Sequence, residues 1–576
     1  MHFLMAVALI APSVTSTAYA VETTSQQSSE AVTSTTDSSR KQEPIITQET
    51  TDIKQEAPNQ ATSDSVKQSQ ETTAPTETTN LETSTAEKEE TSTPQKITIL
   101  GTSDVHGQLW NWSYEDDKEL PVGLSQVSTV VNQVRAQNPA GTVLIDNGDN
   151  IQGTILTDDL YNKAPLVNEK THPMITAMNV MKYDAMVLGN HEFNFGLPLI
   201  QKIQKEATFP ILSANTYNKD GSRFVEGTTT KELDLNQDGQ PDLKVGIIGL
   251  TIPHIPLWDG PRVTSLNFLP LKEEAEKAVT ELKTNDQADI IVASIHAGQQ
   301  NSDLAASADQ VIENVAGIDA YILGHDHLSF TKQGAAPNGK TVPVGGPKDT
   351  GTEVVKIDLS VAKNADKWEV QEGTATIVPT TNVPADEAVK AATKEYHEKT
   401  RAFIQEEIGT ATADFLPKQE IKGIPEAQLQ PTAMISLINN VQKEVTGAQL
   451  SAAALFKYDS KLPAGKIFYA TIFDIYKYPN TLVSVPINGE NLLKYLEKQG
   501  AYYNQTQPDD LTVSFNPNIR VYNYDMISGV DYKIDISKPV GERIVDAKID
   551  GQPLDPAKEY TIATVSYTHL RAHETP

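Results

Sequence analysis

The side chains with the clearest chemical potential are histidine, aspartate and asparagine residues that recur in five short motifs. The chain contains no cysteine, so any metal site must be built from these nitrogen and oxygen ligands. Imidazole combined with carboxylate and amide oxygen suits Mn, Zn or Fe better than the all-oxygen cage that calcium prefers. The motifs are Asp104-Val105-His106, Asp146-Asn147-Gly148-Asp149, Gly189-Asn190-His191-Glu192, His296 and Gly324-His325-Asp326-His327.

Each of these motifs follows a short apolar run of the length of a β-strand. Between residues 96 and 379 such runs alternate with segments whose apolar residues recur at helical spacing. This alternation predicts helical crossovers and a buried sheet, so we expect an α/β protein. Ligands of such sheets bind at the carboxyl ends of strands, and the motifs meet at one sheet edge if the runs are neighbours. The apolar runs are 97–100, 143–145, 185–188, 290–293 and 321–323, and the predicted helices are 124–137, 173–181, 197–206 and 271–282.

Taken in order, the motifs D-x-H, G-D-N, G-N-H-E, a single H and G-H-x-H resemble those of the calcineurin-like metallophosphoesterases. Five motifs in a fixed order are far more specific than any one of them. Within that family the chain is similar to the secreted group of 5'-nucleotidases and 2',3'-cyclic-nucleotide 2'-phosphodiesterases/3'-nucleotidases, over about residues 96–564. The resemblance implies a metallophosphoesterase αββα sandwich, followed by a smaller α/β domain of the 5'-nucleotidase C-terminal type.

The resemblance also implies a centre of two divalent metal ions to which all five motifs contribute. Two such ions ~3.5–4 Å apart activate a bound water and clamp the phosphoryl oxygens during phosphate ester hydrolysis. Asp149 matches the position that bridges the two ions in the family. By the same correspondence, one ion takes Asp104, His106, Asp149 and His327, and the other takes Asp149, Asn190, His296 and His325.

His191 is implied by the resemblance to be the general acid or the residue that stabilises the transition state. A hydrogen-bond acceptor behind the imidazole sets its tautomer. Many 5'-nucleotidases have an aspartate where this chain has Asn194, whereas the cyclic-nucleotide phosphodiesterases resemble the Phe193-Asn194-Phe195 found here. We therefore expect another carboxylate to orient His191, with Asp146 as the candidate.

Recognition of the nucleotide is expected in the second domain, where aromatic rings clamp the base in the resembled group. Tyr478, within residues 476–480, corresponds to one of these rings. Stacking of a base on such a ring contributes ~1–3 kcal/mol. The second ring would fall at Tyr567, in a terminal stretch that does not resemble native sequence.

Two further segments favour the cyclic-nucleotide branch of the family. Where the 5'-nucleotidases carry an Asn-Gly-Gly run with a following Arg, this chain has Leu-Ser-Ala-Ala-Ala-Leu-Phe-Lys at residues 450–457. Residues 521–530 also look like that branch, although a packed strand and turn explains them equally well.

We expect hydrolysis of 2',3'-cyclic nucleotides to 3'-nucleotides and then to nucleosides, in salvage of extracellular nucleotides. The alternatives are a 5'-nucleotidase of the same fold and a surface adhesin that retains the fold.

Composition divides the 576 residues into segments. Residues 1–20 carry an apolar run and end in Ala-Tyr-Ala, which is typical of a signal peptide. Residues 21–95 are rich in Thr, Ser, Glu and Gln and predict a disordered stalk. We expect a metallophosphoesterase domain at 96–382, a long exposed linker helix at 383–408 and the C-terminal domain at 409–564. In the last domain we predict helices at 432–446 and 489–499 and strands at 466–469, 481–487 and near Arg520, Tyr532 and Tyr560.

The charge and the two ends bear on partners and location. A net charge of −29 argues against a long nucleic-acid partner, while small phosphates remain compatible because bound cations reverse the local potential. No segment beyond the signal peptide approaches the ~20 apolar residues of a membrane helix. Residues 565–576 look like a translated sequencing adaptor, so cell-wall attachment through a different native C-terminus is compatible with this chain. We expect a secreted monomer held at the cell surface.

Residues 232–242 resemble the first half of a calcium-binding loop. The twelfth position of that loop is Val245 where an acidic ligand is required, and helical patterns do not flank it. We therefore interpret this segment as a solvated hairpin turn.

Overall fold

The computed structural model describes residues 93–163, 166–365, 367–418, 421–476 and 481–566. The predicted signal peptide and nearly all of the predicted stalk lie outside these residues, as do Tyr478 and Tyr567. Within the described parts of the chain, no helix has the length and apolar character needed to cross a membrane.

The first sheet holds the strands that lead into the first three motifs. Its strand order is β16-β15-β1-β4-β5-β6. Strands β1, β4, β5 and β6 are parallel neighbours, and β15 and β16 are added antiparallel at the side of β1. The bounds are β1 Gln95–Thr102, β4 Thr142–Asp146, β5 Ala185–Val187, β6 Ile211–Leu212, β15 Glu353–Asn364 and β16 Lys367–Pro379.

The second sheet holds the strands that lead into the remaining histidine motifs. Its order is β13-β14-β12-β11-β9-β8, with β9, β11, β12 and β14 parallel. Three of the five apolar runs are therefore neighbouring strands of the first sheet and two are neighbouring strands of the second, so the motifs lie at the ends of strands in both sheets of the sandwich. The bounds are β8 Thr228–Leu233, β9 Leu243–Thr251, β11 Ile290–His296, β12 Ala320–Leu323, β13 Phe330–Ala335 and β14 Thr341–Gly346.

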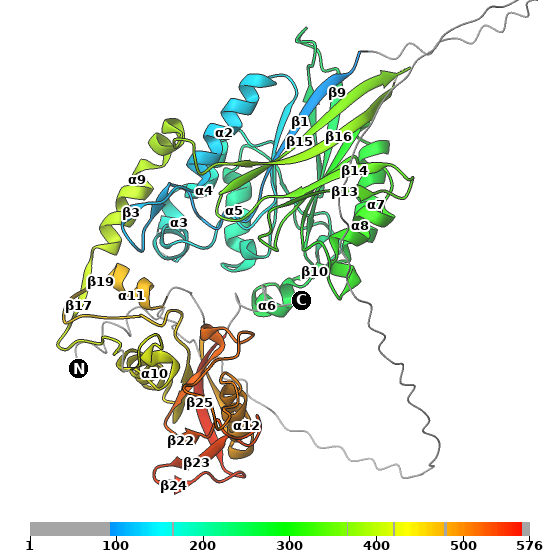
Figure 1. The fold of residues 1–576 in the computed structure, drawn as a ribbon. Helices are drawn as coiled ribbons and strands as arrows, with labels where there is room; N and C mark the ends of the chain where they lie inside the picture. The colour runs from blue at the N-terminus through cyan, green and yellow to red at the C-terminus, as the bar shows by residue number, and fades with distance from the viewer. Residues whose placement is uncertain (1–92, 164–165, 366, 419–420, 477–480, 567–576) are drawn as a thin grey trace, which may run out of the picture. The chain divides into compact units, whose positions relative to one another are not determined.

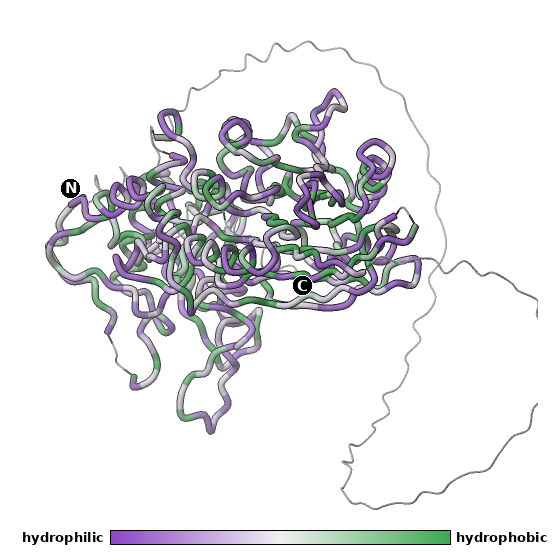
Figure 2. Tube along the Cα trace, turned by 90° about the horizontal axis from the view of Figure 1, so that it is seen from above, coloured by the Kyte–Doolittle hydropathy of each residue, from purple (hydrophilic) through white to green (hydrophobic). Residues whose placement is uncertain are grey.

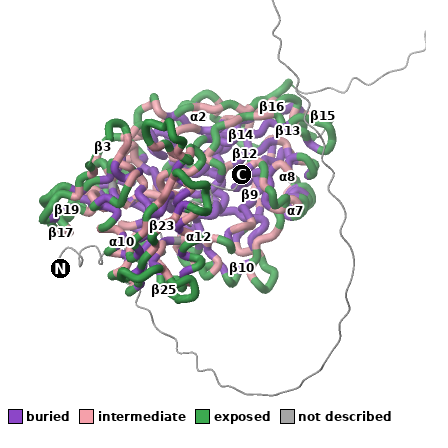
Figure 3. Tube along the Cα trace, turned by 60° about the horizontal axis from the view of Figure 1, so that its bottom comes forward, coloured by how far each residue is buried: buried purple, intermediate pink, exposed green. Residues whose placement is uncertain are grey.

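Alternation along the strands explains why the two sheets pack face to face. Ile97 and Ile99 of β1 belong to an apolar cluster with Val245 and Ile247 of β9, whereas Leu100 belongs to the cluster that includes the helices. Successive side chains of a strand point to opposite faces, so a strand buried on both faces is a continuous apolar run. Figure 3 shows β9 and β12 as buried chain, and Figure 2 shows hydrophilic residues concentrated in the outer loops.

Helices cover the outer faces of both sheets, which confirms the αββα sandwich. Figure 1 shows α2, α4 and α5 on one side of the paired sheets and α7 and α8 on the other, and α2 contacts β4 while α7 contacts β9. The first three predicted helices have the predicted bounds, and the fourth is two residues longer. The bounds are α2 Leu124–Gln137, α4 Pro173–Met181, α5 Leu197–Glu206, α7 Leu271–Thr284 and α8 Ala308–Asn314.

Short elements lie in the connections between these strands and helices. The calcium-like segment is the hairpin turn predicted for it, because it joins the antiparallel strands β8 and β9. In this turn the Asp234 carboxylate accepts hydrogen bonds from the backbone N–H groups of Asp238 and Gly239 at 3.0 and 2.8 Å. The other short elements are β2 Trp112–Ser113, β3 Lys118–Glu119, α3 Leu166–Glu169, β7 Thr216–Asn218, α6 Ile255–Asp259 and β10 Leu266–Phe268.

The linker helix α9, Glu387–Ile404, buries one of its faces, so the expectation of an exposed helix is wrong. The His397 imidazole stacks on the Trp110 indole with ring centroids 3.8 Å apart and an interplanar angle of 3°. Arg401 pairs with Asp117 at 2.7 Å. Its many charged residues suggested a solvated helix, but Val389, Thr393, Tyr396, His397, Thr400 and Ile404 form a buried stripe.

The C-terminal residues form smaller sheets with their own apolar clusters. The central sheet has the order β20-β25-β18-β21, and the helices α10 and α12 contact it. Helices and strands lie near the predicted positions for 432–446, 466–469, 481–487, 489–499, Tyr532 and Tyr560. The bounds are β17 Glu407–Ala411, α10 Ala433–Thr446, β18 Leu450–Ala453, β19 Gly465–Phe468, α11 Tyr469–Ile475, β20 Thr481–Asn488, α12 Gly489–Gly500, β21 Met526–Ser528, β22 Asp531–Ile534, β23 Ile544–Ile549, β24 Gln552–Pro553 and β25 Glu559–Ser566.

The strand predicted near Arg520 is not formed. Arg520 instead precedes a 3₁₀ helix, Val521–Asn523, and its carbonyl accepts a hydrogen bond from the backbone N–H of Asn523 at 3.0 Å. Ile519 is likewise bonded to the carbonyl of Asn516 at 3.2 Å. Asparagine and proline at residues 516–518 favour such turns, so the apolar residues that follow them were misread as a strand.

Candidate metal centre

Seven ligand-type side chains lie where parallel strands of both sheets end. Asp104 and His106 follow β1, Asp149 follows β4, Asn190 follows β5, His296 ends β11, and His325 and His327 follow β12. The loops are bonded to one another, because the backbone N–H groups of Asp104 and His106 donate to the carbonyls of Gly148 and Asp149 at 2.9 and 2.8 Å. The structure thus brings together all of the ligand residues predicted from the sequence.

Most of these residues adopt a backbone conformation that L-residues rarely use. Asp104, His106, Asp149, His325 and His327 have φ between 49° and 73°. Such left-handed residues cost of order 1–3 kcal/mol each when they are not glycine, and they concentrate at functional sites. A single intervening residue in an ordinary strand would also place alternate side chains together, but here the residues lie in left-handed turns after the strand ends, where their ligand atoms converge.

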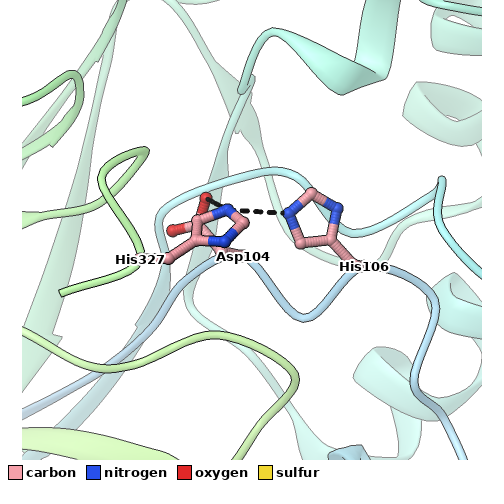
Figure 4. A group of neighbouring side chains, drawn as sticks. All are labelled: Asp104, His106 and His327. Carbon is pink, nitrogen blue, oxygen red and sulfur yellow. Dashed lines mark hydrogen bonds and ion pairs between the residues drawn. The ribbon is translucent and has the colours of Figure 1, made fainter. Parts of the chain in front are cut away.

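One group of ligands consists of Asp104, His106 and His327, which point toward one another in Figure 4. The Nε2 atoms of His106 and His327 lie 3.0 Å apart, and His327 Nε2 lies 3.3 Å from Asp104 Oδ1. One ligand atom from each residue falls within 4.8 Å of the others. That spacing lets three donors converge on one ion.

The second group consists of Asp149, His296 and His325, together with Asn190. His296 Nε2 lies 3.1 Å from Asp149 Oδ2 and 3.1 Å from Asn190 Oδ1. His325 Nδ1 lies 2.8 Å from the same amide oxygen. The carboxylate, amide oxygen and two imidazole nitrogens therefore face a common point.

The electrostatics of the two groups favour bound cations. Burial, reinforced by neighbouring histidines, lowers the pKa of His106 to about 4 and that of His325 to about 3. Both rings are neutral at pH 7 and keep a lone pair for a metal ion. Burial also opposes charge on His296, but the carboxylates of Asp149 and Asp104 raise its pKa to about 10. Without bound metal, a proton on His296 thus balances the negative charge of the buried carboxylates. Divalent ions would supply that positive charge instead.

The residues at this site fit divalent metal ions, as the chemistry of the donor set and its convergence indicate. Both groups combine carboxylate oxygen with imidazole nitrogen, which are ligand types for Mn, Zn and Fe. Asp104 and Asp149 are buried, and buried carboxylates need compensating charge. Asp149 accepts a hydrogen bond from the His191 backbone N–H through Oδ1 at 2.7 Å, while its Oδ2 faces His296.

Two residues that the sequence interpretation missed hold the ligands in place. Glu192, fully buried, accepts hydrogen bonds from the backbone N–H groups of Gly189, Asp149 and Asn150 at 2.7 to 2.8 Å. The carbonyl of Asn147 lies 2.6 Å from His296 Nδ1, so it accepts that N–H and leaves Nε2 for a metal ion. Asn147 directly precedes the G-D-N motif, and Glu192 is the last residue of G-N-H-E. The available signal was the position of Glu192 two residues after the ligand Asn190.

Close packing around Asp149 also explains the glycine of the third motif. A Cβ atom on Gly189 would overlap the Asp149 carboxylate and its backbone nitrogen. Substitution of Gly189 would therefore displace a predicted ligand of both ions. Glycine is required at this position for close approach.

His191 is oriented by Asn194, and the expectation that Asp146 would do this is wrong. His191 Nδ1 lies 2.7 Å from Asn194 Oδ1, and the ring's Nε2 lies 4.0 Å from Asp149 Oδ2, on the side of the metal ligands. Asp146 accepts from the Thr102 hydroxyl at 2.6 Å and from the Gly148 N–H at 2.8 Å. Asp146 is the last residue of β4, and its hydrogen bond to the Gly148 N–H stabilises the loop that follows the strand.

Aromatic side chains also line a cavity of about 370 Å³ in the C-terminal residues. Phe456, which follows β18, is one wall, and its ring lies 5.2 Å from that of Tyr476. Tyr476 directly precedes the residues that include Tyr478, which lies outside the described parts of the chain. The other aromatic walls are Tyr458, Tyr502, Phe515 and Tyr522.

Comparison with known proteins agrees with both halves of this architecture. Residues 97–329 match the family model of the calcineurin-like phosphoesterases, and residues 407–574 match that of the 5'-nucleotidase C-terminal domain. The chain is 31% identical over 526 residues to a 2',3'-cyclic-nucleotide 2'-phosphodiesterase/3'-nucleotidase of Haemophilus influenzae, which covers 82% of this chain and 79% of that protein.

Two further proteins are similar over most of this chain. The trifunctional nucleotide phosphoesterase protein YfkN of Bacillus subtilis is 30% identical over 531 residues, covering 83% of this chain but only 36% of that longer protein. A solved Staphylococcus aureus protein described as a 5'-nucleotidase, in complex with α-ketoglutarate, has a TM-score of 0.63 and 26% identity. That similarity covers 84% of this chain and 93% of the Staphylococcus aureus chain.

Proposed function

Because this chain belongs to the calcineurin-like metallophosphoesterases that carry a 5'-nucleotidase C-terminal domain, we propose that it hydrolyses phosphate esters of nucleotides at the centre described above. The preferred substrates are 2',3'-cyclic nucleotides and the 3'-nucleotides formed from them. The observation that carries the proposal is the convergence of two ligand groups, Asp104/His106/His327 and Asp149/His296/His325, beside His191.

Each reaction is a hydrolysis with water as the only co-substrate. In the first, water adds to phosphorus and the bond from phosphorus to the 2'-oxygen breaks, which leaves a 3'-nucleotide. In the second, another water adds and the bond to the 3'-oxygen breaks, which releases phosphate and nucleoside. Two divalent ions at the centre would lower the pKa of a bound water and neutralise the phosphoryl oxygens.

Residues of the chain supply the remaining functions. Asp149 is proposed to bridge the two ions, with Mn, Zn or Fe as the metals. The protonated His191 ring donates the Nε2 proton to the departing 2'- or 3'-oxygen, which is a poor leaving group without it. Asn194 holds the opposite nitrogen of that ring at 2.7 Å, so Nε2 keeps its direction toward the reacting bond.

Nucleotide recognition is proposed for the C-terminal domain. Tyr478 would stack on the base. It follows Tyr476 by two residues in the chain, and the Tyr476 ring contacts Phe456, a wall of the cavity. A base is a flat ring with π-faces, so aromatic walls bind it without selecting strongly among bases.

Two sequence features support the cyclic-nucleotide preference over a 5'-nucleotidase. Asn194 replaces the aspartate of many 5'-nucleotidases, and residues 450–457 lack the Asn-Gly-Gly segment. A 5'-nucleotidase is the second candidate because the C-terminal residues match that family's domain. An adhesin is less well supported, since all seven ligand positions are filled by residues able to bind metal.

The test is release of phosphate and nucleoside from 2',3'-cyclic AMP, 3'-AMP and 5'-AMP by the full chain, with manganese and with chelator. We expect the cyclic and 3' substrates to be hydrolysed fastest, with both activities abolished by chelator. Fastest hydrolysis of 5'-AMP would favour the second candidate. Hydrolysis that resists chelation would contradict the metal centre.

We also propose that the protein is exported and acts at the cell surface as a monomer. The support is the signal-peptide pattern of residues 1–20 and the composition of residues 21–95, which are rich in Thr, Ser, Glu and Gln. Cell fractionation with an antibody to the folded part is the test. Recovery only from the cytosol would contradict export, and sedimentation as a dimer would contradict the monomer.

A further inference from the structure

We propose that Asp259 is a positioning residue that fixes the amide of Asn194 and, through it, the tautomer of His191. This inference rests on the proposed hydrolysis and adds a residue that acts behind the proton donor. Asp259 is 65 residues from Asn194 in the chain and has no place in the five motifs. Its contacts in the folded structure carry the argument.

The contacts form a short chain that runs away from the metal ligands. His191 Nδ1 lies 2.7 Å from Asn194 Oδ1, and Asn194 Nδ2 donates to Asp259 Oδ2 at 2.8 Å. Arg262 Nη1 donates to the other carboxylate oxygen, Asp259 Oδ1, at 2.9 Å. The Asp259 side chain is only 4% exposed at the end of α6. Each of its oxygens thus has a defined donor.

Hydrogen-bond chemistry allows only one orientation of the amide between these groups. An ionised carboxylate accepts hydrogen bonds and has none to donate, so the NH₂ group of Asn194 must face Asp259. The amide oxygen then faces His191, and since it too can only accept, the proton of the neutral ring must reside on Nδ1. Asp259 therefore determines the tautomer of His191. The neutral ring carries its proton on Nδ1, and Nε2, which faces the metal ligands, carries none.

This tautomer is the one that proton donation requires. With Nδ1–H permanently bonded to Asn194, a proton gained by the ring is carried on Nε2, which lies 4.0 Å from Asp149 Oδ2. Nε2 is then the site that gives its proton to a departing oxygen and receives one afterwards. Without Asp259 the amide can turn over, and Nε2 can be trapped as the fixed donor of the neutral ring.

Arg262 favours the ionised form of Asp259 on which this logic depends, because both Asp259 oxygens accept hydrogen bonds, one from Arg262 and one from Asn194. Burial raises the pKa of Asp259, and the Arg262 guanidinium and the Asn194 amide oppose that rise. The guanidinium also occupies Oδ1, which leaves Oδ2 for Asn194. The neutral amide of Asn194 separates the Asp259 carboxylate from the His191 ring. The main effect of Asp259 is therefore on the orientation and tautomer of that ring.

A direct spectroscopic test does not depend on turnover. The imidazole ¹⁵N shifts of His191 would be recorded in the full chain labelled with ¹⁵N-histidine, with zinc added, and assigned with His191→Gln. We expect the neutral ring to carry its proton on Nδ1, and Asp259→Asn to produce a mixture of tautomers. A neutral ring protonated on Nε2 in the unchanged protein would overturn the proposal. Because that outcome is measured on the unchanged protein, it can overturn the proposal even if Asp259→Asn fails to fold.

Kinetics separate positioning from a structural role. General acid catalysis contributes about 10²- to 10⁴-fold, so loss of its alignment in Asp259→Asn should lower kcat for 3'-AMP by at least about tenfold with KM within about twofold. p-Nitrophenyl phosphate needs no proton on its leaving group, and its kcat should fall by less than about twofold. Equal losses on both substrates would show that Asp259 only supports the fold of the site.

A swap of the two side chains gives a sharper result. Asn194→Asp alone would place two carboxylates 2.8 Å apart and should impair activity, because both cannot easily ionise. In the double variant Asn194→Asp/Asp259→Asn, the new carboxylate accepts Nδ1–H directly and the new amide donates to it. We expect kcat for 3'-AMP to recover to within about threefold of the unchanged protein, as coupled neighbours are non-additive. Additive losses would refute the relay.

Asp303→Asn is the matched control. Asp303 is also an aspartate paired with a side chain, since its Oδ2 lies 2.9 Å from His254 Nε2, but its side chain is 53% exposed. We expect unchanged kinetics and unchanged His191 shifts in this variant. If the unchanged protein hydrolyses none of the phosphate esters, the proposed function fails, while the ¹⁵N experiment still decides whether Asp259 sets the tautomer.

Discussion

Replacement of His397 by phenylalanine should remove a defined part of the acid sensitivity of this protein. His397 is 7% exposed on the inner face of α9 and stacks on Trp110. Its Nδ1 lies 3.0 Å from the Tyr114 hydroxyl. Burial, together with the nearby Arg401 guanidinium, lowers the pKa of His397 to about 4 from the model-peptide value of 6.5.

The sign and size of the effect follow from proton binding. Between pH 6.5 and pH 4 the unfolded chain carries a proton on this ring that the folded chain does not, so stability falls as pH falls through that window. One pKa unit corresponds to about 1.4 kcal/mol, and the loss between pH 7 and pH 5 is about 2 kcal/mol. Other buried groups also titrate in this range, but they are the same in the unchanged protein and in His397→Phe, so their effect cancels in the comparison.

The assay is urea unfolding at pH 7 and pH 5, followed by tryptophan fluorescence. His397→Phe keeps a flat ring against Trp110 but leaves the Tyr114 hydroxyl without this partner, which should cost about 1–2 kcal/mol at both pH values. The variant should lose about 2 kcal/mol less than the unchanged protein on acidification. Equal losses in the two proteins would refute the assignment of a neutral, buried His397.

Three further substitutions test the proposed roles of single residues. Asp149→Asn should reduce hydrolysis of every substrate by more than about 10³-fold, because both ions lose a carboxylate ligand; retained manganese binding with full activity would contradict this. His191→Gln should lower kcat by about 10²-fold or more for 3'-AMP and much less for p-nitrophenyl phosphate, and equal losses would place His191 outside proton transfer. Tyr478→Ala should raise KM for nucleotides by about tenfold, equivalent to ~1–3 kcal/mol of lost stacking, and should spare p-nitrophenyl phosphate; equal loss on both would make Tyr478 structural.

A fourth substitution concerns the stability of the C-terminal domain. Arg543 is 1% exposed, and its guanidinium donates to the carbonyls of Lys538, Gly500 and Tyr503 at 2.7 to 2.9 Å. Arg543→Met should lower the free energy of unfolding by about 3 kcal/mol or more, since three buried carbonyls lose a charged donor. Circular dichroism melting would measure it, and a change below about 1 kcal/mol would contradict this role.

The local pattern of apolar residues was sufficient to predict the helices and strands that carry the site. The helices α2, α4 and α5 begin and end where apolar spacing predicted, because an amphipathic period is written in neighbouring residues. Strand-length apolar runs likewise predicted where the metal motifs begin. The division of those runs between two sheets was not predictable from the runs themselves, since a strand buried against helices and one buried against a second sheet are equally apolar.

Two elements of the chain were misread, for different reasons. The many charged residues of α9 suggested solvent, yet Trp110 and Tyr114, which come from the loop after the first motif, cover His397. Arg520 lies in a segment where turns at Asn516 and Asn523 replaced the predicted strand. For α9 the deciding partners lie outside the window that a periodicity argument uses, whereas near Arg520 local turn-forming residues outweighed the apolar pattern.

By itself, the sequence determined the class of site, because His, Asp and Asn at five strand ends in a fixed order have few other uses. It also determined which side chains are available as ligands, since a chain without cysteine offers only nitrogen and oxygen donors. Only the tertiary structure decided how those side chains are oriented. Asn194 meets Asp259 across 65 residues, and five of the seven ligand residues adopt left-handed backbone conformations. Hydrogen bonds and backbone strain of this kind depend on which loops the fold places side by side.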